Sequence, residues 1–305
     1  MNQQERSYII LLKWGMKMTA NKLGIIGGTG RYDIEGLTNI KSLDLDTPFG
    51  KPSDQITTGE LGDTLIAFLP RHGKGHTIPP SEIPSLANIY ALKMIGVEQI
   101  IAFNAVGSLR EEIQPGSIVI PDQFIDKTTR RPNTFFGKGL VAHISFIDPV
   151  CPNLSKTVMN AATKTGADVH FGGTYVVMEG PAFSTRAESL LHRSWGAHVI
   201  GMTALPEAKL AREAGICYST VACVTDYDCW HESEESVSIE MIKRIQRQQN
   251  DISQNIIRLV ALDLPPRESC QCANTLKNTV LTHPEYIDAK YAEGLKPIIG
   301  DCLGT

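Results

Sequence analysis

The sequence predicts a single-domain α/β fold in which a β-sheet is flanked by helices. Short apolar runs of strand length alternate with longer segments whose apolar residues recur at helical spacing, a pattern typical of layered α/β proteins. No internal repeat, low-complexity tract or long linker appears before about residue 264. We therefore expect one domain at 21–264, an N-terminal extension at 1–20, and a C-terminal segment at 265–305 that packs on or near the domain.

The individual elements follow from length and periodicity. The expected strands are short apolar runs of the kind found in buried strands, at 23–26, 64–69, 99–103, 117–120, 173–178, 199–200 and 217–224. The expected helices have apolar residues three and four positions apart, at 85–94, 153–164, 186–195, 206–214 and 239–259. Several strands run directly into glycine or polar residues, and ligands of open α/β sheets bind at the carboxyl ends of strands.

The overall composition excludes several classes of protein. A net charge of −4 and a pI of about 6.1 give no support for nucleic-acid binding. The apolar stretch 8–14 is too short to span a membrane. The seven cysteines are an odd number without a disulfide framework, which favours a cytoplasmic protein. Cys270 and Cys272 form the only close pair, and their spacing is not that of a Cys-x-x-Cys zinc half-site.

Two acidic residues follow the strand expected at 217–224. Asp226 and Asp228 are two positions apart, and side chains at i and i+2 of an extended chain project to the same side. Both carboxylates would then face one pocket at the end of the strand. The simpler alternative is a solvated turn that happens to carry two acids.

Other strand ends offer groups suited to phosphate. A glycine-rich turn at 24–30 contains Thr29, although its glycines fit neither the dinucleotide fingerprint nor the P-loop. Arg71 offers a forked set of donors, and His72 offers one more. Thr203 precedes a helix and can cap it or hold an anion. A tight turn and a solvated basic loop are the alternative readings of the first two segments.

These segments together resemble a known family. The blocks GIIGGTG, RHGKGHTIPPSEI, NAVGSLREEIQPGSIVIPDQFID, MEGPAFSTRAES, MTALPEAKLAREAGICY and VTDYDCW are similar to the trimeric purine nucleoside phosphorylases, and more closely to their 5′-methylthioadenosine phosphorylase branch. The resemblance covers about 24–264. It implies a twisted mixed β-sheet flanked by helices and a pentosyltransferase that converts phosphate and methylthioadenosine to adenine and 5-methylthioribose 1-phosphate. It calls for no metal and no cofactor, with phosphate as co-substrate.

The resemblance also implies roles for individual residues. The phosphate contacts would come from Thr29, Arg71, His72, Asn104, Ala105 and Thr203. The nucleoside contacts would come from Phe183, Ser184, Met202, Asp226, Asp228, His143, Val237 and Ile239. Asp226 and Asp228 would be the catalytic pair, with Asp226 protonating purine N7. His143 would reach in from a neighbouring subunit of a homotrimer, or of a dimer of trimers.

The residue types favour a 6-aminopurine. A carboxylate accepts hydrogen bonds from the N6 amino group of adenine, whereas a 6-oxopurine needs a donor. Val237 and Ile239 favour an apolar 5′ pocket, which would still admit some adenosine. Asn104-Ala105 departs from the Thr-Ala of many methylthioadenosine enzymes and resembles the 6-oxopurine branch. A phosphorylase for 6-oxopurine nucleosides or methylthioinosine therefore stays open, as do a nucleotide-binding oxidoreductase and a non-catalytic nucleoside-binding protein.

Overall fold

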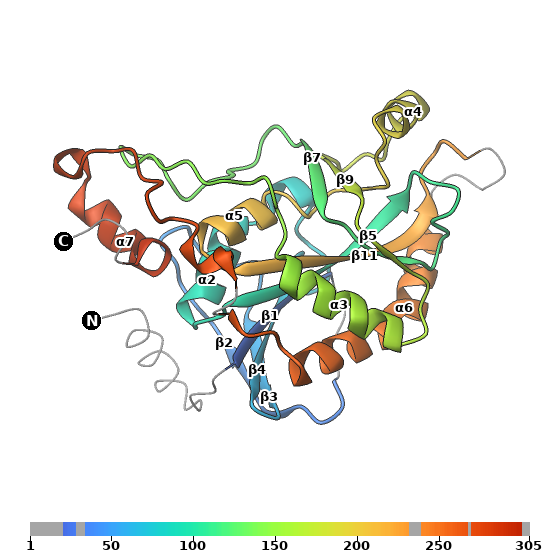
Figure 1. Cartoon of the computed structure of the whole chain (residues 1–305), viewed down its shortest axis with the longest axis horizontal. Helices are drawn as coiled ribbons and strands as arrows, with labels where there is room; N and C mark the ends of the chain where they lie inside the picture. Colours follow the sequence, from blue (N-terminus) through green and yellow to red (C-terminus); the bar gives the residue numbers. More distant parts are fainter. Residues whose placement is uncertain (1–20, 29–33, 232–238, 268–269, 301–305) are drawn as a thin grey trace.

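The computed structural model describes residues 21–28, 34–231, 239–267 and 270–300, which form one mixed sheet with helices on both faces (Figure 1). The 11-stranded sheet consists of β1 (Asn21–Gly27), β2 (Thr38–Leu43), β3 (Ile56–Leu61), β4 (Thr64–Pro70), β5 (Gln99–Ser108), β6 (Ile118–Ile120), β7 (Gln123–Lys127), β8 (Val169–Phe171), β9 (Thr174–Met178), β10 (Val199–Gly201) and β11 (Cys217–Tyr227). The α-helices are α2 (Ser85–Met94), α3 (Pro152–Lys164), α4 (Arg186–Ser194), α5 (Glu207–Glu213), α6 (Ile239–Leu262) and α7 (Ala289–Ile299). Short 3-10 helices are η1 (Pro80–Glu82), η3 (Gln271–Asn274) and η4 (Pro284–Tyr286).

The expected fold class, a single α/β domain with a mixed sheet, is confirmed, and each predicted strand and helix is present. The strands that the sequence did not reveal are β2, β3, β7 and β8. Most residues of β2 are exposed, and β8 is only three residues long, so neither forms an apolar run. Pairing with neighbouring strands, rather than local hydrophobicity, places them in the sheet.

The sheet is organised around β5. On one side β5 pairs with β11 in parallel along its whole length, from Gln99 to Ser108. On the other side it pairs in parallel with β1 at 99–102 and antiparallel with β10 at 107–108. Along this edge of β5 the neighbouring strand therefore changes from the parallel β1 to the antiparallel β10.

Two apolar layers hold the helices against the sheet. Helices α3 and α6 supply Leu154, Val158, Ile256 and Val260 to one layer, and α2, α5 and α7 supply Ile89, Leu92, Leu210 and Leu295 to the other. Along β11, Val221 and Cys223 point into the first layer, while Ala222 and Val224 point into the second. This alternation explains why the strand reads as a continuous apolar run: both of its faces are buried.

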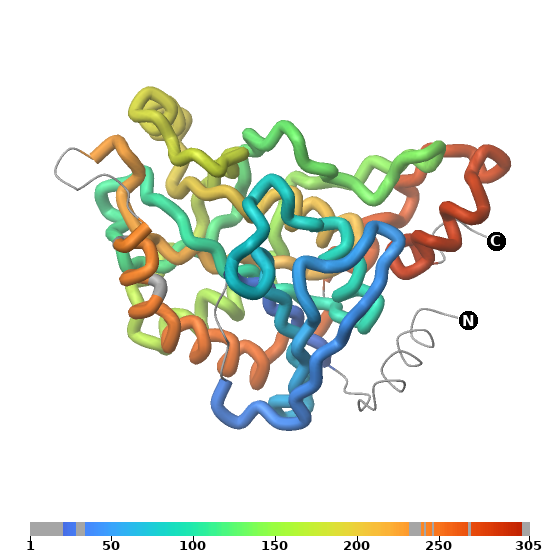
Figure 2. The backbone as a smooth tube through the Cα atoms, turned by 180° about the vertical axis from the view of Figure 1, so that it is seen from behind, coloured from blue at the N-terminus to red at the C-terminus, as the bar shows by residue number. Residues whose placement is uncertain are grey.

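The segment 270–300 lies on the side of the molecule away from α4, as the red and yellow parts of Figure 2 show. The Tyr90 hydroxyl of α2 donates to the Gly294 carbonyl of α7 at 2.6 Å. Ala142 and Val280 form an isolated antiparallel bridge, which joins the segment to the long loop before α3. No helix in the described part of the chain combines the length and apolar character needed to cross a membrane.

Candidate functional site

The candidate site lies where β1 and β10 meet the same edge of β5. β1 accompanies β5 as far as Ala102, and β10 joins it at Gly107, so residues 103–106 lie between these two partners. Ligands of α/β sheets bind at such a change of direction. Ala105 is exposed here although its neighbours in β5 are buried. The arrangement leaves a stretch of strand backbone available to a ligand.

Arg71 follows β4 at this edge and is held by a buried ion pair. Its Nε and Nη2 donate to the two carboxylate oxygens of Glu207 at 2.8 and 2.9 Å, and its Nη1 donates to the Phe103 carbonyl at 2.9 Å. Both partners are about 98% buried. Burial alone would lower the pKa of Arg71, but attraction to Glu207 outweighs it and raises that pKa above its usual value. The guanidinium is therefore a fixed cation.

Asn104 joins the end of β5 to the segment after β10. Its amide donates to the Thr203 hydroxyl at 2.7 Å and its carbonyl oxygen accepts from the Thr220 hydroxyl at 2.6 Å. Arg71 donates to the carbonyl of Phe103, the residue that precedes Asn104 in β5, so the guanidinium lies close to the Asn104–Thr203 contact. The structure brings Arg71, Asn104, Ala105 and Thr203 to one end of the site.

His72, which follows Arg71, has a neutral imidazole ring at neutral pH, whereas the sequence predicted a hydrogen-bond donor to phosphate. Its Nδ1 is 2.8 Å from the Ile78 carbonyl, which only accepts hydrogen bonds, so Nδ1 carries the hydrogen. Burial lowers the pKa of His72 to about 4 against the weaker opposing effect of that bond. The neutral ring presents Nε2 as an acceptor. It becomes a donor to phosphate, as the sequence predicted, only after gaining a proton.

The two acidic residues lie together at the other end of the site. Asp226 and Asp228 are only 6% and 4% exposed. A Cβ atom on Gly107 would lie 2.9 Å from Asp226 Oδ1 and 3.3 Å from Asp228 Cβ, so both acids pack against the same point of β5. The i, i+2 geometry is retained because the register irregularity between β5 and β11 falls at Thr225, before the pair. The solvated-turn alternative is wrong.

Burial favours the protonated form of Asp226, against a hydrogen bond from Thr225. Thr225 Oγ1 lies 3.2 Å from the Val106 carbonyl and 2.7 Å from Asp226 Oδ2. The Thr225 hydroxyl donates to both of these acceptors with its one hydrogen, and its bond to Asp226 is the shorter. Burial raises the pKa of Asp226 to about 6, Thr225 opposes this, and the charge of Asp228 adds to it. Asp226 is thus an acid close to its working range.

A loop between β9 and α4 lies beside this acidic end. A Cβ atom on Gly180 would lie 2.5 Å from Met202 Sδ, which places the loop against Met202. The Ser184 carbonyl accepts from the Cys229 thiol at 3.2 Å, next to Asp228. Phe183 is 47% exposed. Ser184 of this loop therefore lies beside the segment that carries the acids, and Met202 contacts the same loop at Gly180.

The remaining predicted residues lie elsewhere or outside the described residues. His143 is exposed on the long loop before α3, where its amide donates to the Thr279 carbonyl at 3.0 Å. That segment belongs to the side that carries α7 (Figure 1). Ile239 is 57% exposed at the start of α6. Thr29 and Val237 lie outside the described residues.

Sequence reasoning missed Glu207 and Gly107. Glu207 lies in the first turn of α5, where an acid normally signals nothing more than favourable interaction with the helix dipole. Gly107 is one glycine in a strand, and an isolated strand glycine can indicate a close approach of other groups. That signal was available from the sequence; the partner of Glu207, 136 residues away, was not.

Comparison with known proteins identifies the family of the chain. Residues 22–261 match the model of the phosphorylase superfamily. A protein of Geobacter sulfurreducens named S-methyl-5′-thioadenosine phosphorylase is 54% identical over 91% of this chain and 98% of its own. A protein of Koribacter versatilis with the same name is 47% identical over 93% of this chain and 97% of its own.

Solved structures give the same result. A methylthioadenosine phosphorylase from an antarctic soil metagenomic library is 44% identical, covers 92% of this chain and 99% of its own, and superimposes with a TM-score of 0.85. A variant of the Schistosoma mansoni adenosine/methylthioadenosine phosphorylase, in complex with methylthioadenosine, is 38% identical over 81% of this chain and 94% of its own, with a TM-score of 0.75.

Proposed function

The chain belongs to the phosphorylase superfamily, and from this premise we propose that it cleaves S-methyl-5′-thioadenosine with phosphate, giving adenine and 5-methylthioribose 1-phosphate. The observation that carries the proposal is the pair of buried acids at Gly107. Asp228 Oδ2 is buried and has no hydrogen-bond partner among the described residues. A buried acceptor without a donor is costly, and the N6 amino group of adenine would supply the missing donor.

The reaction follows from the order of groups along β5. Phe103, which accepts from Arg71, and Gly107, which contacts Asp226, are four residues apart, or about 13 Å at 3.3 Å per residue. A nucleoside lying along this stretch has its ribose over phosphate and its base beside the acids. The phosphate oxygen forms a bond to C1′ as the bond from C1′ to N9 breaks, and Asp226 gives its proton to N7.

The phosphate end supplies charge and orientation. Three of the five N–H groups of Arg71 are bonded to Glu207 and Phe103, which leaves two for an anion. Thr203, positioned by Asn104, adds a hydroxyl. A bound phosphate would raise the pKa of His72, because a nearby negative charge favours the imidazolium. His72 would then donate through Nε2. Phosphate thereby stabilises the positive charge that develops on the ribose.

A substrate panel tests the proposal. Methylthioadenosine, adenosine, methylthioinosine and inosine would each be incubated with the enzyme, with and without phosphate or arsenate, and the released base measured by chromatography. We expect adenine from methylthioadenosine, slower release from adenosine, and no release without the anion. Faster release of hypoxanthine than adenine would reject the base assignment and favour the 6-oxopurine alternative to which Asn104 points.

We further propose that His143 completes the 5′ pocket of a neighbouring subunit in a homotrimer. Its exposure and its place beside 275–281, away from the acids of its own chain, support this arrangement. His143→Ala should raise the KM for methylthioadenosine while leaving phosphate binding unchanged. Light scattering measures the assembly, and a fully active monomer would refute both statements.

A further inference from the structure

Four cysteines from three distant parts of the chain converge at one point. Cys151 precedes α3, Cys217 begins β11, and Cys270 and Cys272 flank the start of η3. Their Sγ atoms all lie within 4.8 Å of one another. Cys270 Sγ is 3.4 Å from Cys151 Sγ and 3.6 Å from Cys217 Sγ. Three of the four are buried and Cys270 is partly buried.

These separations have the dimensions of a tetrahedral zinc site. Zinc binds cysteine sulfur at about 2.3 Å, which places the sulfurs of a tetrahedral Cys₄ site about 3.8 Å apart. An iron–sulfur cluster holds its thiolates around a larger inorganic core, so four sulfurs packed this closely suit one ion. The Cys-x-Cys spacing did not indicate a metal site because the second pair, Cys151 and Cys217, comes from elsewhere in the fold.

Hydrogen-bond donors and a helix N-terminus lie next to the sulfur atoms of the cluster. Arg212 Nη1 donates to Cys272 Sγ at 3.3 Å, and the Cys272 amide donates to Cys270 Sγ at 3.4 Å. Cys151 occupies the N-cap of α3, where the helix dipole favours negative charge. Such donors to sulfur are the outer contacts that support bound metals.

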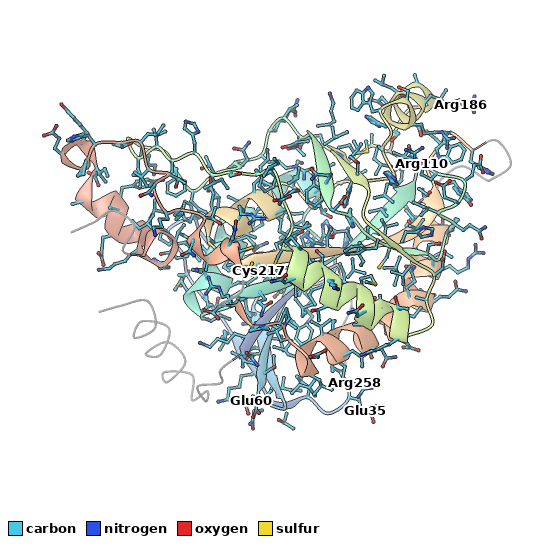
Figure 3. All side chains as sticks on the ribbon, viewed as in Figure 1. Glu35, Glu60, Arg110, Arg186, Cys217 and Arg258 are labelled. Carbon is cyan, nitrogen blue, oxygen red and sulfur yellow. The ribbon has the colours of Figure 1, made fainter. Side chains whose placement is uncertain are left out.

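The cluster is far from the acids of the functional site. Cys217 and Asp226 lie at opposite ends of β11, nine residues or about 30 Å apart. Figure 3 labels Cys217 beside α3, well away from the end of the sheet that carries β7 and β9. Four protein ligands leave no open position for a substrate, which is the property of a structural site.

We propose that Cys151, Cys217, Cys270 and Cys272 bind one zinc ion, which fastens the C-terminal segment to the core of the domain. The ion joins η3 to the start of β11 and to the beginning of α3. From η3 the chain continues to Val280, which bridges Ala142, and to α7, which packs on α2. Zinc thus fixes the first residues of the segment that supports the loop carrying His143. This site takes no part in phosphorolysis and does not depend on the proposed reaction.

Metal content of the full chain tests the proposal. The protein would be expressed with added zinc, purified without chelators, and measured by plasma mass spectrometry. We expect about one zinc ion per chain. The zinc content of the double variant Cys270→Ser/Cys272→Ser should be at least tenfold lower. Cys223→Ala, which removes a buried thiol of β11 outside the cluster, should retain it.

Two further measurements keep the test decisive if the double variant does not fold. The wild-type protein, stripped by a chelator, should have a lower Tm that added zinc restores. Cobalt loaded in place of zinc should give the strong visible absorption of tetrahedral thiolate coordination. A wild-type protein without metal, one containing iron instead of zinc, or one whose four thiols are oxidised to disulfides when purified would each overturn the proposal.

Discussion

Replacing Asp226 by asparagine should slow the reaction and stabilise the protein, for one electrostatic reason. Burial raises the pKa of this carboxyl from 3.8 to about 6, so the folded state holds the proton more tightly than the unfolded state. The resulting stabilisation is complete below about pH 4 and is lost as pH rises through 6. The difference between 3.8 and 6 corresponds to about 3 kcal/mol at neutral pH, since one pKa unit is worth 1.36 kcal/mol. Asparagine carries no charge and avoids that cost.

Thermal unfolding at pH 4.5 and pH 7.5 measures the effect. At pH 7.5 we expect Asp226→Asn to raise the Tm by roughly 5 °C, and at pH 4.5 the difference should be much smaller. The rate of base release should fall about 10²-fold or more, because asparagine cannot protonate N7. Asp126→Asn is the control with the opposite sign: burial would raise the pKa of Asp126, but hydrogen bonds from Lys209 and Thr128 lower it, so its loss should destabilise the protein at pH 7.5. An Asp226 variant no more stable than the wild type at pH 7.5 would refute the reasoning.

Three further substitutions test separate contacts. Glu207→Gln leaves the Arg71 guanidinium buried without its carboxylate, so urea unfolding should show a loss of about 3 kcal/mol and assays a higher KM for phosphate; a loss below about 1 kcal/mol would contradict this. Gly107→Ala places a methyl group against both acids and forces them apart, so kcat should fall at least about tenfold with the circular dichroism spectrum unchanged. Gly294→Ala is the control, because its methyl group would meet only one atom, at 4.0 Å, and kcat should stay the same. Asp228→Asn replaces a carboxylate that only accepts hydrogen bonds by an amide that can also donate to a 6-oxopurine. The ratio of kcat/KM for methylthioadenosine to that for methylthioinosine should therefore fall about tenfold or more; an unchanged ratio would remove Asp228 from base recognition.

The strands that the sequence predicted well are those that are buried on both faces of the sheet. β5 and β11 are covered on both faces, and such strands are largely apolar, which makes them visible as runs. β2 is mostly exposed, and no local pattern distinguishes it from a loop. The acids of β11 were also predictable, since two positions of extended chain determine their relative direction.

Contacts made across long sequence separations were not predictable from the residues alone. The forked donors of Arg71 suit phosphate and carboxylate equally well, so sequence could not reveal that Glu207 already occupies two of them. The tautomer of His72 depends on the Ile78 carbonyl, a backbone group that carries no sequence signal. The four cysteines belong to the same class, because 119 residues separate Cys151 from Cys270.

The position of the acids within the fold explains how the protein tolerates the free-energy cost of burying their carboxyl groups. An uncompensated carboxyl at the end of an edge strand would favour local unfolding, which releases the charge to water. β11 instead pairs with β5 on one side and with β6 on the other, and helices pack on both faces. Exposing Asp226 would therefore require breaking a strand whose first ten residues are all buried. The free energy that holds β11 in the sheet is what keeps Asp226 dry, and a dry Asp226 is what raises its pKa toward the pH at which it can serve as an acid.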